Sequence, residues 1–208
     1  LTSIKAYTQL LERKLKQNEE NSDLVYVKKT LEQIEKLNSL ITDLLDVSKI
    51  ENGKLKINKK SENLELVIQN AIETILHTNS ADVKIERHGM QPDFVIAFDK
   101  IRIEQVLINF LSNAIKYSPK NNQIIVTTFW DEKEVRISVT DFGIGIPDFK
   151  QEYVFHKFYR VEESSFQFQG MGIGLYICSE IIKQHHGSIG VSSEIGEGST
   201  FYFTLPIN

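Results

Sequence analysis

The segment "EVRISVTDFGIGIP" (134–147) carries a strand pattern that ends in a carboxylate, Asp141, and is followed by Gly143, Gly145 and Pro147. Glycines at alternate positions let the backbone approach a ligand closely. A carboxylate at a strand end can accept a hydrogen bond from an exocyclic amine, which adenine offers and guanine replaces with an oxygen. The same pattern is also typical of a strand followed by a tight turn. The segment therefore predicts either an adenine-binding turn or a structural one.

Asp-Phe-Gly is also the magnesium-binding triplet of eukaryotic-type protein kinases. Such a kinase needs a Gly-rich loop near its start, a strand lysine paired with a helical glutamate, and a His-Arg-Asp loop ahead of the triplet. The sequence contains none of these. The Asp-Phe-Gly triplet must therefore belong to a structural feature other than a magnesium site of that kinase class.

A helix expected from Asp99 to Tyr117 carries polar residues along one narrow stripe, which are Arg102, Gln105, Asn109, Asn113 and Lys116. Asparagine is a poor helix former, whereas its amide oxygen suits a hard cation such as Mg²⁺. Lys116, one turn further on, could reach a phosphate. A stripe of this kind is also typical of a solvent-exposed helix face.

A second glycine cluster, "GMGIGLYI" (170–177), fits neither a Rossmann fingerprint nor a P-loop, but it opens a helix. Free amides and the helix dipole make such an N-terminus suitable for a phosphate. The stretch before it, "FHKFYRVEESSFQFQ" (155–169), is aromatic and basic at first and polar later. It predicts a lid with Arg160 near the phosphates, or a surface loop whose Phe166 and Phe168 pack beneath it.

The first 50 residues contain neither proline nor glycine, and their apolar residues recur at heptad-like steps. This pattern predicts a helical hairpin that breaks in the polar run 17–23, with Ser22 or Asp23 as the N-cap of the second helix. The apolar stripe is wider than two helices can cover, so we expect dimerisation into a four-helix bundle.

From residue 56 onward strands and helices alternate irregularly, which predicts an α+β domain with helices against one face of a mixed sheet. Asn63 is expected to cap a helix to about Thr78, and Asp99 to cap the helix to Tyr117. The strands expected most clearly are 82–86, 94–98, 123–130 and 134–140, followed by a helix over 174–186 and a closing strand pair.

Composition excludes several classes of protein. The 208 residues are 41% hydrophobic and 25% charged with a formal net charge of -4, so we expect no nucleic-acid partner. Apolar runs are too short to span a bilayer, so we expect no direct membrane contact by these residues. The single cysteine, Cys178, excludes an internal disulfide.

Four stretches occur in an order that resembles the N, G1, F and G2 boxes of bacterial two-component sensor histidine kinases: "NFLSNAIKYSP", "DFGIGIP", "VFHKFYR" and "GMGIGLYI". The hairpin resembles the dimerisation helices of the same family. The resemblance implies that residues 1–55 form a dimerisation and histidine phosphotransfer hairpin, truncated at its start. Residues 56–208 would form an ATP-binding catalytic domain, an α/β-sandwich of the Bergerat (GHKL) type.

The resemblance also implies roles for individual residues. Asp141 would bind the adenine amine, while Gly143 and Gly145 shape the turn beneath the base. Asn109 and Asn113 would hold Mg²⁺, with Asn113 the better candidate for a direct ligand. ATP and Mg²⁺ are thus the implied cofactors.

The phosphate side would be lined by Lys116, Tyr117 and Arg160. The implied reaction transfers the γ-phosphoryl group of ATP to a histidine nitrogen, with Asn109, Lys116 and Arg160 positioning and neutralising the phosphates. Three glycines would end the lid and free the amides around it: Gly170, Gly172 and Gly174.

The family motif puts the acceptor histidine six positions before Leu1, and residues 1–57 contain no histidine. We therefore expect the acceptor upstream of Leu1. The histidines near helix ends, among them His185 and His186, are expected to serve the helix dipole or solvent, with a metal site at that pair as a minor alternative.

The family further implies a homodimer through residues 1–50 and a response regulator receiver domain whose aspartate receives the phosphoryl group. It implies a cytoplasmic location, and a sensor region ahead of Leu1 that in many members carries membrane spans.

Three alternatives remain open at this level. A GHKL-type ATPase clamp would hydrolyse ATP, but its general base is an acidic residue at the position of Asn109, and an amide cannot take that proton. A protein kinase acting on serine within the same fold fits the hairpin less well. The other alternative is a helical interaction module that binds no nucleotide.

Overall fold

The computed structural model describes residues 2–17, 21–78, 83–89, 93–119, 121–161 and 171–207. The chain divides into two compact units, Leu1–Leu55 and Lys56–Asn208.

The first unit consists of two helices that pack on each other, α1 (Thr2–Gln17) and α2 (Asn21–Glu51). The predicted helical hairpin is therefore present. The predicted N-caps Ser22 and Asp23 are wrong, since both lie inside α2, because the connection between the helices is shorter than the polar run suggested. Throughout the described parts of the chain, every helix is too short or too polar to cross a membrane.

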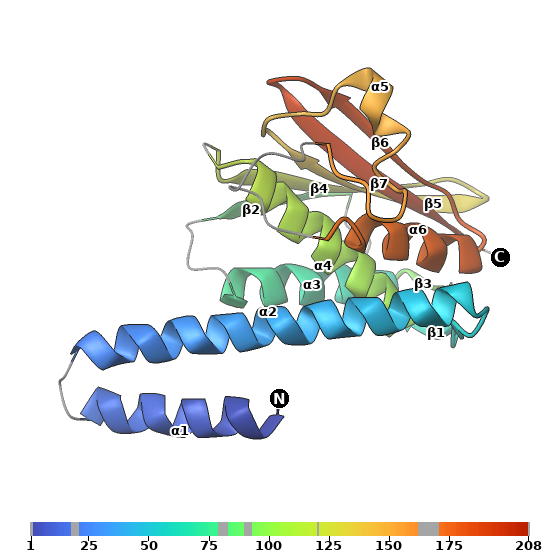
Figure 1. The fold of residues 1–208 in the computed structure, drawn as a ribbon. Coiled ribbons are helices and arrows are strands. Elements are labelled where there is room, and N and C mark those ends of the chain that lie inside the picture. The colour runs from blue at the N-terminus through green and yellow to red at the C-terminus, as the bar shows by residue number, and fades with distance from the viewer. Residues whose placement is uncertain are drawn as a thin grey trace. The chain divides into compact units, whose positions relative to one another are not determined.

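The second unit contains the remaining elements, which are β1 (Lys60–Asn63), α3 (Leu64–Thr78), β2 (Lys84–His88), β3 (Val95–Phe98), α4 (Lys100–Tyr117), β4 (Gln123–Trp130), β5 (Glu134–Asp141), α5 (Asp148–Gln151), α6 (Gly174–Gln184), β6 (Ile189–Glu194) and β7 (Gly198–Pro206). Five strands form one sheet in the order β2-β4-β5-β7-β6, with β2 parallel to β4 and the other pairs antiparallel. Helices α3, α4 and α6 lie on one face of this sheet (Figure 1). The predicted α+β class and mixed sheet are confirmed.

The core lies between that face and the helices. Alternate residues of β4, β5 and β7 point inward, as in the paired row Val126, Val139 and Phe201. The helix α4 covers this row, and its Phe110 ring lies 5.5 Å from the Phe201 ring, centroid to centroid. Burial of this apolar surface is the main stabilising contribution to the domain.

Both predicted helix caps of this domain are confirmed. Asn63 Oδ1 accepts a hydrogen bond from the N–H of Leu66 (3.2 Å), and Asp99 Oδ1 accepts one from the N–H of Arg102 (3.2 Å). Each bond satisfies a backbone donor that would otherwise lack a partner in the first helical turn.

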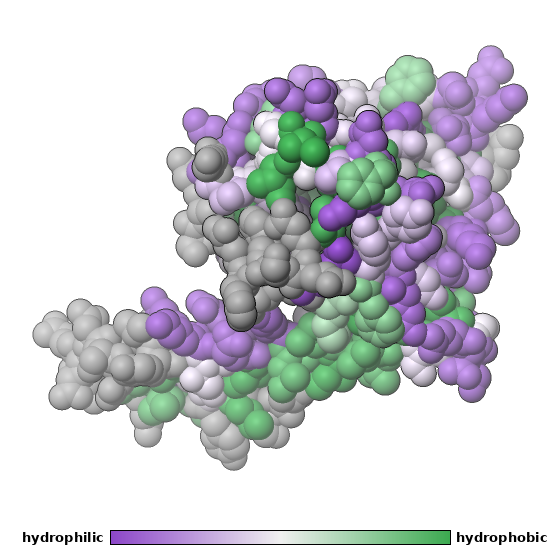
Figure 2. Space-filling view, turned by 45° about the horizontal axis from the view of Figure 1, so that its top comes forward, coloured by the Kyte–Doolittle hydropathy of each residue, from purple (hydrophilic) through white to green (hydrophobic). Residues whose placement is uncertain are grey.

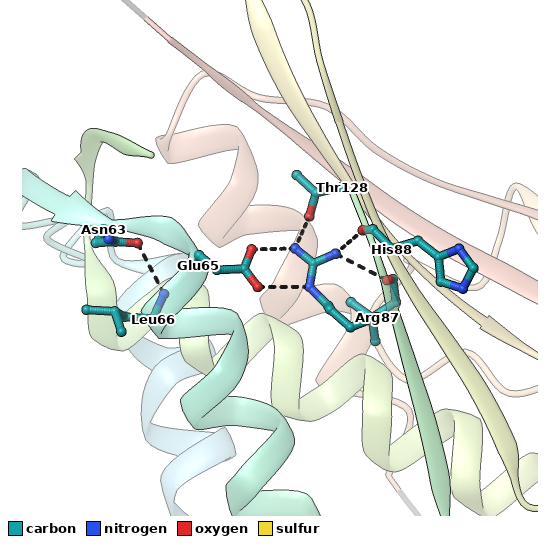
Figure 3. Close-up of polar contacts among 7 residues, drawn as sticks. Asn63, Glu65, Leu66, Arg87, His88 and Thr128 are labelled. Atoms are coloured by element: carbon teal, nitrogen blue, oxygen red, sulfur yellow. Dashed lines mark hydrogen bonds and ion pairs between the residues drawn. The ribbon is translucent and has the colours of Figure 1, made fainter. Parts of the chain in front are cut away.

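A half-buried ion pair joins α3 to the edge strand β2 (Figure 3). Arg87 Nε and Nη2 donate to the two carboxylate oxygens of Glu65, at 3.1 and 2.6 Å. The same guanidinium also donates to Thr128 Oγ1 (2.6 Å) and to the carbonyl oxygen of Val126 (3.2 Å). Such a fully bonded, bidentate pair fixes geometry as well as adding energy.

Candidate functional site

Asp141 is the last residue of β5 and continues its inward-facing series Val135, Ile137 and Val139. Its side chain is therefore buried, with only 4% of the residue exposed. Oδ1 accepts hydrogen bonds from the N–H of Gly143 (2.9 Å) and from Ser118 Oγ (3.1 Å). Burial raises the pKa of the Asp141 carboxyl above its ordinary value, while these bonds partly oppose the shift.

The turn after Asp141 is held against the hairpin of β6 and β7. Gly145 has φ of 69°, and a Cβ there would lie 2.0 Å from the carbonyl oxygen of Glu194, so only glycine fits. The N–H of Ile146 donates to Ser193 Oγ (2.8 Å), and the Gln151 amide bridges the carbonyl oxygens of Ile146 (3.1 Å) and Ser193 (2.7 Å). The turn is thus fixed from two sides.

The C-terminal end of α4 lies beside this turn. The N–H of Ile144 donates to the carbonyl oxygen of Tyr117 (3.2 Å), and Ser118, the C-cap of α4, reaches Asp141 directly. The strand-end carboxylate therefore lies beside the C-terminal end of α4, where the polar stripe also ends.

Along α4 the predicted residues of the stripe contact one another. Asn113 Nδ2 donates to Asn109 Oδ1 (3.0 Å), and both side chains are half-buried. Lys116 Nζ lies 3.1 Å from the Tyr117 hydroxyl and 4.7 Å from the centroid of its ring. The asparagines offer two amide oxygens one turn apart, and oxygen is the ligand type that Mg²⁺ prefers, so these residues fit such an ion.

The N-terminus of α6 meets the same stripe. Gly174 opens α6, and a Cβ at this position would lie 2.2 Å from Asn109 Nδ2. The N-cap position is Ile173, whose apolar side chain cannot satisfy the first amides of the helix. Those amides and the positive end of the helix dipole suit a phosphate.

The aromatic and basic stretch is joined to the second glycine cluster, because the N–H of Phe158 donates to the carbonyl oxygen of Gly172 (2.9 Å). Arg160 follows and is half-buried. Its predicted place near the phosphates stays a prediction. Gly170, together with Phe166 and Phe168 of the predicted lid, lies outside the described residues.

Hydrophobic side chains reach the surface amid hydrophilic ones on the face drawn in Figure 2. Near the turn and α5 the exposed apolar residues are Phe142, Ile144, Phe149, Tyr153 and Ile195.

Three contributors were not expected from the sequence, namely Ser118, Gln151 and Ser193. The signal for Ser118 was present, since it follows the polar stripe directly, but its partner Asp141 is 23 residues further along the chain. The expectation for His185 was right in one part, since its Nδ1 lies 2.8 Å from the carbonyl oxygen of Ile181 in the last turn of α6. It was wrong about solvent, because the ring lies on the inward side of the helix end, where it is buried and accepts a hydrogen bond from the N–H of Asp99 (2.9 Å). His186 is exposed, as expected.

Comparison with known proteins gives a family match in each of the two units. Residues 98–208 match the family described as histidine kinase-, DNA gyrase B-, and HSP90-like ATPase, which covers more than half of the chain. Residues 1–53 match the His Kinase A (phospho-acceptor) domain.

Individual relatives agree with these matches. The adaptive-response sensory kinase SasA of Synechococcus sp. (strain JA-3-3Ab) is 34% identical over 178 residues, 85% of this chain and 47% of that protein. The sensor histidine kinase WalK of Bacillus subtilis (strain 168) is 34% identical over 192 residues, 90% of this chain and 31% of that protein. The chain thus spans less than half the length of these relatives.

Among solved structures, full-length ShkA in complex with AMPPNP has the same fold, with a TM-score of 0.73, 24% identity, and coverage of 94% of this chain and 41% of that one. The ATPase-type domain and the phospho-acceptor domain that precedes it therefore show that the chain belongs to the histidine kinase-, DNA gyrase B- and HSP90-like ATPase family and, within it, to the two-component sensor histidine kinases.

Proposed function

We propose that residues 56–208 bind ATP together with Mg²⁺, and that the protein transfers the γ-phosphoryl group to a histidine outside residues 1–208. The observation that carries this proposal is the buried carboxylate of Asp141, which is held beside the amide-bearing helix α4. Burying a carboxylate costs free energy, which the hydrogen bonds from Gly143 and Ser118 only partly offset, so a bound donor would stabilise it further. The exocyclic amine of adenine is a suitable donor.

The triphosphate would extend from Asp141 along α4 toward the N-terminus of α6. Asn109 and Asn113 would hold Mg²⁺, which neutralises phosphate charge when bound. The contact between Asn109 and Gly174 supports this path, because it brings the amides of α6 to the same place as the asparagine pair. Lys116, Tyr117 and Arg160 would bind the phosphates, and the last glycines before α6, Gly170, Gly172 and Gly174, would end a lid over them.

The phosphoryl group is proposed to pass from histidine to an aspartate of a response regulator. The first unit would form the homodimer contact through residues 1–50. Its α2 leaves a row of large apolar side chains 39–56% exposed, at spacings of three and four residues: Leu37, Ile41, Leu44 and Leu45. Such a row stabilises a helix bundle when a second copy covers it.

An ATPase clamp of the same fold would hydrolyse ATP instead. Water attack needs a general base, and position 109 holds an amide, which cannot take a proton. The site therefore favours transfer to an external nucleophile stronger than water over hydrolysis.

Titration calorimetry with Mg²⁺ and AMPPNP tests the binding step. We expect saturable binding that Asn113→Ala weakens at least about tenfold, since hydrogen-bonded contacts to charged groups contribute about 1.5–3 kcal/mol each. The matched control is Asn122→Ala, which replaces an exposed asparagine after α4. No saturation by the unmodified chain would contradict the proposal. Steady ATP hydrolysis abolished by Asn109→Ala would favour the ATPase clamp.

Restoring the segment that carries the acceptor tests the transfer step. With radiolabelled ATP we expect an acid-labile, base-stable phosphoprotein only when that segment is present. Label on residues 1–208 alone would show that the acceptor lies among them.

A further inference from the structure

The start of α4 and the end of α6 meet at a buried histidine. His185 follows α6 directly and is 1% exposed. Its Nε2 accepts a hydrogen bond from the N–H of Asp99 (2.9 Å), and its Nδ1 lies 2.8 Å from the carbonyl oxygen of Ile181. A carbonyl oxygen can only accept and a backbone N–H can only donate. The ring must therefore be the neutral tautomer with its proton on Nδ1.

The same junction holds the segment that leads in from the first unit. Asp99 Oδ1 caps α4 at Arg102, while Oδ2 accepts a hydrogen bond from the N–H of Asn58 (2.8 Å). Lys59 Nζ donates to the carbonyl oxygen of His185 (3.3 Å). Residues 58 and 59, which come just after the boundary at Leu55, are thus bonded to both helices at one point.

The two helices also meet at the candidate site, where Gly174 packs on Asn109. They therefore run in opposite directions, and these two contacts lie at the two ends of α6, at the start and at the middle of α4. Their buried side chains are all apolar or thiol. Apolar contacts are non-directional, so the directional bonds at His185 set how the helices are aligned along their length.

We infer that His185 is a positioning residue for nucleotide binding: its neutral ring fixes α4 against α6, and so fixes Asn109 and Asn113 against the amides that would hold the phosphates. The inference rests on the proposed function. It assigns a role to a side chain that lies at the opposite end of the helix pair from the nucleotide.

The position of the proton makes this role testable. The charged or titratable groups that face His185 are Lys59, Asp99 and His186. Burial is the largest cause that lowers the pKa of His185 below its ordinary value near 6.5, and Lys59 and His186 add to it. The contribution of His185 to folding is therefore complete above about pH 6.5 and is lost as the pH falls through the lower folded-state pKa. A second ring proton would point at the N–H of Asp99 and open the junction.

The experiment measures the Kd of the whole chain for Mg²⁺ and AMPPNP by calorimetry at pH 7.5 and then at falling pH until the free chain begins to unfold. His185→Gln offers an amide oxygen to the N–H of Asp99 and does not titrate. It should bind within about twofold of the unmodified chain at pH 7.5. As the pH falls, the Kd of the unmodified chain divided by that of His185→Gln should rise at least about fivefold, the lower end of usual coupling between distant sites. Titration of the ligand's own phosphates is the same for both proteins and cancels in this ratio.

Two further variants complete the design. His185→Leu fills the volume but accepts no hydrogen bond, so it should bind weakly at every pH. His186→Asn is the control, because it removes an exposed neighbouring histidine at φ of 63°, a conformation that asparagine tolerates. It should keep the affinity of the unmodified chain at pH 7.5 and shift the profile only slightly, because His186 is the smallest of the causes that lower the pKa of His185. Because Asp141 is unchanged throughout, its own titration cancels in the comparison.

Normal affinity of His185→Leu at pH 7.5, or a Kd ratio between the unmodified chain and His185→Gln that does not change with pH, would overturn the inference. Absence of binding by the unmodified chain at pH 7.5 would instead contradict the proposed function. Amide hydrogen exchange, which needs no nucleotide, tests the junction by itself: at pH 7.5 the N–H of Ile103, bonded to Asp99 in the first turn of α4, should be less protected in His185→Leu than in the unmodified chain. Equal protection would overturn the inference.

Discussion

Ionisation of Asp141 has opposite effects on the proposed nucleotide binding and on the stability of the fold. In the proposed function its ionised form accepts a hydrogen bond from a purine amine, yet burial disfavours that form and raises its pKa from 3.8. A raised folded-state pKa means that the favourable contribution is complete below about pH 3.8 and is lost as the pH rises through the folded-state value. Near pH 7 the ionised carboxylate therefore lowers the stability of the nucleotide-free protein.

Replacing Asp141 by asparagine should separate stability from binding. Ser118 and Gly143 can still donate to the amide oxygen, but the amide nitrogen cannot accept from adenine. We expect Kd for Mg²⁺ and AMPPNP to rise at least about tenfold. The melting temperature without nucleotide should change little at pH 7, because removal of the buried charge is offset by loss of the bond from the Ser199 backbone.

The matched control for this substitution is Asp93→Asn, which changes an exposed carboxylate at φ of 62°, where asparagine is tolerated. It should leave both measurements unchanged. Normal affinity of Asp141→Asn would remove Asp141 from the binding site.

At the scale of elements, α6 can approach α4 closely because Gly174 has no side chain. A methyl group at Gly174 would meet the Asn109 amide at 2.2 Å. The neighbour is a side chain and not backbone, so Asn109 can rotate away and the fold can persist.

We therefore expect Gly174→Ala to melt within a few degrees of the unmodified protein, because alanine suits a helix better than glycine. Kd for Mg²⁺ and AMPPNP should rise about tenfold, since Asn109 is displaced. In a double-mutant cycle, Asn109→Ala with Gly174→Ala should bind no more weakly than Asn109→Ala alone. Additive losses would show that Gly174 acts through its own backbone.

The ion pair of Arg87 in β2 with Glu65 in α3 predicts that removing Arg87 strongly lowers the free energy of unfolding. Arg87→Ala leaves the Glu65 carboxylate without its guanidinium in a site where the two side chains are 12% and 17% exposed. Removing one partner of such a pair costs about 3 kcal/mol. A domain of this size should then melt roughly 6–12 °C lower.

The control for Arg87→Ala is the exposed pair of Lys183 and Glu180, 3.8 Å apart, with the lysine 76% exposed. Lys183→Ala should change stability by less than about 0.5 kcal/mol in chemical denaturation. Equal losses in the two variants would show that the bond of Arg87 to Glu65 adds nothing specific.

The sequence predicted elements whose pattern is local. Strand β4 and the helix caps at Asn63 and Asp99 follow from alternation and side-chain chemistry, and they are present as expected. Strand β1, "KSEN", has no strand pattern, and only its pairing with β3 makes it extended. The role of His185 was missed for the same reason, since its partner Asp99 is 86 residues away in the chain.

At the scale of the whole molecule, the two units carry different proposed tasks, namely dimerisation and nucleotide binding. Ile41 lies on the exposed apolar row of α2, and Ser39 lies on the same helix and is also exposed. Substitutions at these two positions change the first unit and leave the sequence of the second unit as it is.

Ile41→Glu should convert the dimer to a monomer in light scattering at micromolar concentration, because a buried charge without a partner opposes the bundle. Ser39→Glu should stay dimeric. Both variants should keep the nucleotide Kd of the unmodified chain within about twofold, since independent sites behave additively. A dimeric Ile41→Glu would place the interface elsewhere.

The alternation of side chains along β5 limits which insertions and deletions of codons the strand can accept. Side chains at Val135, Ile137, Val139 and Asp141 share one face of the sheet. Gain or loss of one codon inside the strand would turn every later side chain over, bring Thr140 inward and expose the carboxylate to water. Gain or loss of two codons would restore the original face. The proposed recognition of the purine would thus depend on the number of residues in β5 as well as on the identity of Asp141.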